Sequence, residues 1–139
     1  MTSFRNIIFT TILLFSMVAQ NRGLASLNSA KSARDLDDVG VVSIDDTNFL
    51  HNGLCYEPKA TIQNFGDQLK SFDVTMHIAD EYSCTKKVIL PAKASVTVIF
   101  NSLILKKGTI TFHVKVKCIN DINPLNDTIS TLVVVAGNK

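Results

Sequence analysis

The chain has 139 residues, with 14 Lys and Arg against 12 Asp and Glu. The lysines stand singly or in pairs, so the sequence offers no basic surface of the kind that binds nucleic acid or anionic membranes. A chain of this length forms one domain, which can bury a core without the help of a metal.

The first 25 residues are expected to form a secretory signal peptide. Arg5 precedes an apolar run over residues 7–19, and the small residues Gly23 and Ala25 favour cleavage after Ala25. The run is shorter than the about 20 residues that a membrane span needs, although an uncleaved anchor is the alternative. We therefore expect a protein that is secreted or held at the cell surface, with no membrane span after cleavage.

The remaining chain divides into a leader and one domain. Residues 26–38 are small and polar, which is typical of a flexible leader. From residue 39 to residue 136 apolar and polar residues alternate in short runs, as in strands with one buried face. Runs rich in Asn, Asp, Gly and Pro separate them. The pattern predicts seven strands, over residues 39–45, 58–64, 71–78, 85–90, 94–101, 109–119 and 128–136.

Short strands at this spacing predict an all-β fold, a seven-strand antiparallel immunoglobulin-like β-sandwich. Phe72, Phe100 and Phe112 have the inward parity of their strands and are expected in the core. The sequence lacks the Trp and the paired Cys of true antibody domains, so the likeness is one of architecture.

The order of the runs resembles a known module. "DVGVVSI" opens the domain, and "PKATIQNFGDQLKSFDVTMHI", "VILPAKASVTVIFNSL", "KGTITFHVKV" and "DINPLNDT" follow. Over residues 38–136 the chain is similar to the cell-adhesion-related (CARDB) modules of bacteria, especially those of long secreted surface proteins. The resemblance implies a seven-strand sandwich with a scaffolding or adhesive role and no catalysis.

The segment "NDINPLND", residues 120–127, is expected to be a structural turn, because Asn and Asp side chains bond readily to nearby backbone. A calcium site is the alternative, in which Asp121, Asn123 and Asp127 supply three of about six oxygen ligands. Asn126 begins an N-glycosylation sequon, which matters only in a eukaryotic host.

Two histidines, His77 and His113, have the outward parity of their strands. Solvated side chains are the favoured interpretation, because two imidazoles supply only half of the ligands of a zinc site. A surface metal pair is the alternative. No Gly-x-Ser-x-Gly elbow is present, and no catalytic constellation assembles from the sequence. We therefore expect no enzyme activity and no cofactor.

Three cysteines in an oxidising compartment allow at most one internal disulfide. In the expected sandwich Cys55 and Cys84 lie at one end and Cys118 at the other, beyond disulfide reach. A disulfide, if one forms, is expected to join Cys55 to Cys84 and to leave Cys118 as a buried free thiol.

Two functions remain in competition. The favoured one is a secreted or cell-surface adhesion or scaffolding module that contacts a protein or cell-surface partner. The alternative is a small exported carrier of an apolar ligand held between the sheets, against which the regular large inward residues argue. The contact strand is expected to be Ile129 to Val135, which carries no charge. Leu132 or Val133, whichever faces solvent, is the candidate contact residue.

Overall fold

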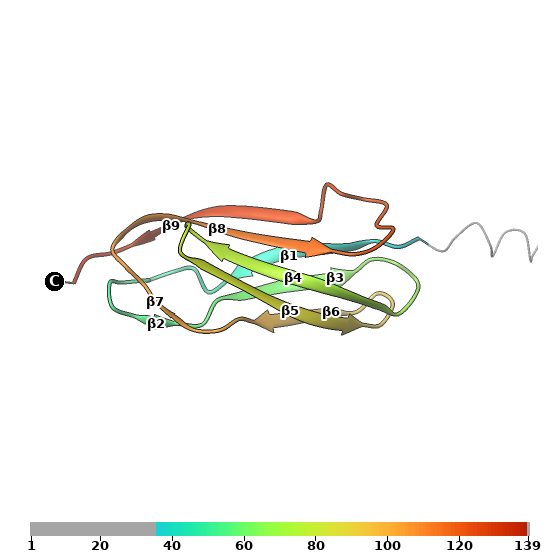
Figure 1. Cartoon of the computed structure of the whole chain (residues 1–139), viewed down its shortest axis with the longest axis horizontal. Coiled ribbons are helices and arrows are strands. Elements are labelled where there is room, and N and C mark those ends of the chain that lie inside the picture. Colours follow the sequence, from blue (N-terminus) through green and yellow to red (C-terminus); the bar gives the residue numbers. More distant parts are fainter. Residues whose placement is uncertain (1–35, 139) are drawn as a thin grey trace, which may run out of the picture. The chain divides into compact units, whose positions relative to one another are not determined.

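Three antiparallel sheets make up the described part of the chain, residues 36–138 of a computed structural model (Figure 1). Strand order is β1-β3-β6 in one sheet, β5-β4-β8-β9 in the second, and β2-β7 in a small third sheet. The strands are β1 (Val39–Asp45), β2 (Cys55–Tyr56), β3 (Lys59–Asn64), β4 (Lys70–Ile78), β5 (Tyr82–Leu90), β6 (Ser95–Ile99), β7 (Leu103–Ile104), β8 (Gly108–Lys117) and β9 (Thr128–Val135).

The predicted all-β, immunoglobulin-like architecture is confirmed, with differences at the strand ends. β5 begins at Tyr82, three residues earlier than predicted, because its ladder with β4 continues to the pair Ile78 and Tyr82 at the tight turn. β6 is shorter than predicted and ends at Ile99. The short strands β2 and β7 were not predicted, since two residues show no periodicity.

The core follows the predicted alternation. Phe112 is fully buried, and its ring centroid lies 5.9 Å from that of Tyr56. Full burial of one such side chain stabilises the fold by about 1.5–3 kcal/mol. The largest fully buried side chains come from both main sheets and the loops between them: Phe112, Ile62, Met76, Leu105, Val39, Val74, Val114, Val116, Val135, Asn64 and Pro58.

Asn64 is the buried polar residue of the described region. Its Nδ2 donates hydrogen bonds to the carbonyl oxygens of Gln68, Leu90 and Pro91 at 2.7, 3.0 and 3.1 Å. Its Oδ1 accepts one from the backbone N of Gly66 at 3.0 Å. One side chain therefore fastens the β3–β4 turn to the end of β5.

Residues 36–38 are joined to the sandwich, although the sequence assigns them to a flexible leader over residues 26–38. Asp37 forms an ion pair with Lys70. The carbonyl oxygen of Asp38 accepts two backbone hydrogen bonds from the β3–β4 turn, at 2.7 and 3.0 Å. The leader prediction is therefore wrong for these three residues, whose long-range partners leave no local signal in the sequence.

The predicted signal peptide and the leader as far as residue 35 lie outside the described residues. Within residues 36–138, the structure contains no helix of the length and apolar character needed to cross a membrane.

Candidate functional site

The loop between β8 and β9 forms a turn, as its many Asn and Asp residues predict, and it also binds the start of the domain through hydrogen bonds. Asp121 Oδ2 accepts a hydrogen bond from the backbone N of Val39 at 2.9 Å. Asp121 Oδ1 accepts another from the backbone N of Asn123 at 2.8 Å. Both oxygens of this carboxylate therefore serve the turn, which agrees with the structural interpretation of this segment.

Asn126 fastens the same loop to β1. Its side-chain Nδ2 donates to Asp38 Oδ1 at 2.7 Å. Its backbone carbonyl oxygen accepts a hydrogen bond from the backbone N of Val41 at 2.8 Å. A Cβ at Gly40 would lie 2.6 Å from Cγ of Asn126, so only glycine fits there. The sequon nitrogen is thus engaged in the folded domain, and attachment of a glycan requires that this bond be broken.

The calcium interpretation finds little further support. Asp127 Oδ1 and Asn126 Oδ1 are buried without a hydrogen-bond partner. Among the residues that the structure describes, however, no group of three or more His, Cys, Asp or Glu side chains is placed to hold a metal ion. Asp121, Asn123 and Asp127 lie in one loop, and calcium would need about six oxygen ligands there.

Burial, and then repulsion from Asp121 and Asp38, raises the pKa of Asp127. A carboxyl with a raised folded pKa stabilises the fold below its unfolded pKa of about 3.9, and this contribution is lost as the pH rises through the folded value. Asp127→Asn is therefore expected to raise the thermal midpoint slightly at pH 7, and the effect is small because the group is partly solvated.

The gain from Asp127→Asn should vanish at pH 3, where Asp127 is already protonated. Calorimetric scans at pH 3 and pH 7 measure both values. Asp73→Asn is the matched control, because Asp73 is an exposed partner of Lys87 at 3.7 Å and should show no gain at pH 7. A larger gain at pH 3 than at pH 7 would contradict the assigned cause.

The three cysteines are free in this structure, and the predicted Cys55–Cys84 bond is not formed. Cys55 is exposed on β2 opposite Ile104, whereas Cys84 is buried on β5 opposite Met76. Cys118 is half-exposed rather than buried, and the pKa of its thiol is raised by its partial burial and then by Asp121.

The edge strand β9 presents one apolar row to solvent. Leu132 is 72% exposed and Val134 is 71% exposed, whereas Val133 and Val135 are buried. Leu132 lies opposite Thr111 of β8 on the outer face of the sheet. Of the two candidate contact residues, Leu132 is therefore the accessible one and Val133 belongs to the core.

No protein-family profile and no curated protein sequence matches the chain. Among solved structures, it is similar to a CARDB domain from Pyrococcus furiosus, which was crystallised in complex with di-metal ions. The TM-score is 0.66 at 17% sequence identity, and the match covers 75% of this chain and 97% of that chain. The chain has a CARDB-like fold.

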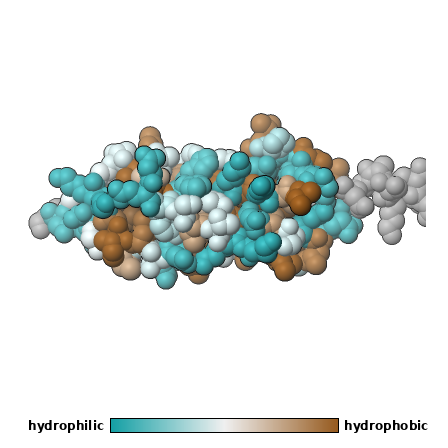
Figure 2. Space-filling view, in the orientation of Figure 1, coloured by the Kyte–Doolittle hydropathy of each residue, from teal (hydrophilic) through white to brown (hydrophobic). Residues whose placement is uncertain are grey.

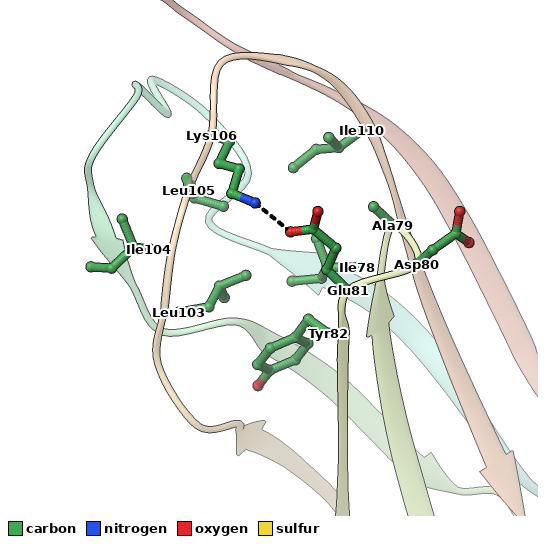
Figure 3. Close-up of a pocket in the computed structure, with 10 residues that line it drawn as sticks. All are labelled: Ile78, Ala79, Asp80, Glu81, Tyr82, Leu103, Ile104, Leu105, Lys106 and Ile110. Carbon is green, nitrogen blue, oxygen red and sulfur yellow. Dashed lines mark hydrogen bonds and ion pairs between the residues drawn. The ribbon is translucent and has the colours of Figure 1, made fainter.

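The CARDB-like domain has a small apolar cavity of about 230 Å³ beside the β4–β5 turn (Figure 3). Ile78, Leu103, Leu105 and Ile110 contribute apolar side chains, and Tyr82 lies along one side (Figure 3). An ion pair crosses it, with Lys106 Nζ 2.7 Å from Glu81 Oε2. The sequence did not predict this cavity, because β7 and the segment after it show no alternation of apolar and polar residues.

The CARDB-like domain also exposes an aromatic ring in the loop between β1 and β2. Phe49 is 98% exposed and has a φ of 60°. The loop is hydrogen-bonded to Ala136, the residue that follows β9. The backbone N of Ala136 donates to the backbone O of Leu50 at 2.9 Å, and the backbone N of Asn52 donates to the backbone O of Ala136 at 2.8 Å. Apolar surface is visible toward both ends of the domain (Figure 2).

Proposed function

We propose that this CARDB-like domain is a secreted or surface-attached, non-catalytic module that works by protein–protein contact. One observation carries the proposal, namely that β9 is an edge strand without charge whose outer face bears Leu132 and Val134. An edge strand offers unpaired backbone groups to a second chain, and apolar side chains add specificity when a partner strand pairs with it.

The opposite edge of the same sheet is protected in a way that β9 is not. β5 carries Lys86 at the inward parity, opposite the buried Val74 of β4. Lys86 Nζ donates to Asn101 Oδ1 at 2.8 Å. An inward-pointing charge is a common device against edge-to-edge pairing. The contrast between the two edges supports β9 as the strand that is left free for a partner.

The loop of Phe49 extends the proposed contact surface past the end of β9. A non-glycine residue at positive φ costs about 1–3 kcal/mol, and such strain is tolerated most often where it serves a site. Aromatic side chains, Phe among them, are also enriched at protein interfaces relative to the rest of the surface. Phe49, Leu132 and Val134 together define what we term the β9 surface.

The signal segment predicted from the sequence supports export, and the lack of a nucleophile elbow supports a non-catalytic role. The alternative, a carrier of an apolar ligand, has weaker support. The space between the sheets is filled by core side chains, and the cavity of about 230 Å³ lies below the about 300 Å³ at which ligand pockets begin. A thermal-shift panel of lipids would detect a carrier.

Leu132→Lys is expected to abolish self-association or to reduce retention at the cell surface severalfold, while leaving the thermal midpoint nearly unchanged. The reason is that a Lys on the outer face of an edge strand opposes pairing without entering the core. Sedimentation of the purified protein and fractionation of producing cells measure the two effects.

Thr97→Lys is the matched control, because it places the same charge on the exposed face of β6, an uncharged edge of the other sheet. We expect it to behave as the wild type does. If Leu132→Lys changes neither self-association nor retention, and the purified protein turns over a substrate, the proposed function is wrong.

A further inference from the structure

Two histidines lie side by side at the centre of the outer face of the four-stranded sheet. His77 of β4 and His113 of β8 are direct partners in the antiparallel ladder. Their ring centroids are 6.2 Å apart, and the ring planes are tilted by 43°. Directly opposed residues have Cβ atoms about 4.5–5.5 Å apart, so both imidazoles can reach a single ion between them.

A third strand orients one of the rings. Ser130 of β9 is the partner of His113 on its other side, and Ser130 Oγ lies 2.6 Å from His113 Nδ1. When Nδ1–H donates to this hydroxyl, the lone pair of Nε2 is free for a metal. Metal-binding histidines commonly have their second ring nitrogen held in this way, which fixes the tautomer and the ring orientation.

The surface beside the pair is hollowed and contains one acidic residue. An open hollow of about 350 Å³ is lined by His77 and His113 together with Asp80 and Thr111. It has room for an ion and its water ligands, and the carboxylate of Asp80 gives it a negative charge that favours a cation.

We propose that His77 and His113 bind one divalent transition-metal ion of the type that prefers imidazole, namely Zn²⁺, Ni²⁺ or Cu²⁺. Tetrahedral bonds of about 2.1 Å place the two nitrogens about 3.4 Å apart, which the two side chains reach by rotation. No group of three or more ligand side chains is placed for a metal in residues 36–138, so water completes the coordination. The bound ion joins the central strands β4 and β8.

Calorimetric titration of the full chain with Ni²⁺ tests this site. The wild type is expected to bind one ion, and His77→Ala and His113→Ala should each weaken binding by more than about tenfold. Ser130→Ala removes the outer partner of His113 rather than a ligand, and it should weaken binding by about tenfold, the lower end of the range typical of such partners. His51→Ala and Cys55→Ser are the controls, because they remove the third histidine and the exposed thiol.

A second measurement guards against variants that fold poorly. An ion that binds only the folded state raises the thermal midpoint, so Ni²⁺ should stabilise the wild type and the two controls but neither His77→Ala nor His113→Ala. If the two histidine variants bind and respond as the wild type does, or if the wild type binds no Ni²⁺, the site does not exist. Binding lost in His51→Ala or Cys55→Ser alone would also overturn the proposal.

Discussion

Replacement of Phe112 by alanine is expected to lower the free energy of unfolding by about 3–5 kcal/mol. Phe112 is fully buried at the centre of β8, and its ring packs against Tyr56. Truncation removes the transfer free energy of a large side chain and leaves a cavity that the paired strands on both sides cannot close. Urea denaturation at pH 7 measures the loss.

Thr111→Ala is the matched control for Phe112→Ala, because Thr111 is the preceding residue on β8 and its side chain is exposed. Its expected cost is below about 0.5 kcal/mol, as for most surface substitutions. Losses of equal size at the two positions would refute the alternation from which the fold was predicted.

Asn64→Asp is expected to cost about 3 kcal/mol or more at pH 7, although the side chain keeps its size. The amide nitrogen of Asn64 donates to three carbonyl oxygens, whereas a carboxylate in its place donates to none. The change leaves buried acceptors unsatisfied and places a charge in their midst. The turn between β3 and β4 should then separate from the end of β5.

The loss in Asn64→Asp should be smaller at pH 4, where the carboxyl takes up a proton and regains one donor. Gln63→Glu makes the same chemical change at the neighbouring, half-buried residue of β3 and should be nearly neutral. Denaturation of both variants at pH 4 and pH 7 separates the two cases. A cost at Asn64 no larger than that at Gln63 would contradict its role.

The fold could be predicted because the alternation in β4 and β8 is unbroken. Every inward residue of β4 from Phe72 to Ile78 is apolar and buried, so a shift of one residue would expose the whole set. The start of β5 was predicted too late, because Tyr82 and Ser83 resemble turn residues. Only their pairing with β4 makes them part of a strand.

The candidate contact surface could be predicted in part. β9 is apolar at both parities, so its sequence does not say whether Leu132 or Val133 faces solvent. The pairing of Leu132 with the exposed Thr111 decides the question. Phe49 was missed because it lies in a loop without periodicity, where burial is set by the tertiary structure.

The loop between β8 and β9 was correctly interpreted as a turn, but its partners were not predictable. Asp121 bonds to Val39 and Asn126 bonds to Asp38, across more than 80 residues of sequence. Nothing in a local pattern indicates such a pair. For the same reason, the docking of residues 36–38 was missed.

Residue-resolved amide hydrogen exchange in the dilute, monomeric protein tests directly whether β9 is a free edge. The amides that point toward β8 should be protected, whereas the alternate amides of residues 128–135 should exchange rapidly, because β9 is the last strand in its sheet. β4 is the internal control, since it has a partner on each side and every amide in its paired centre should be protected. The fast amides of β9 should become protected when the protein self-associates or binds its partner. Uniform protection along β9 in the dilute protein would mean that the chain already covers this edge, and it would contradict the proposed contact surface.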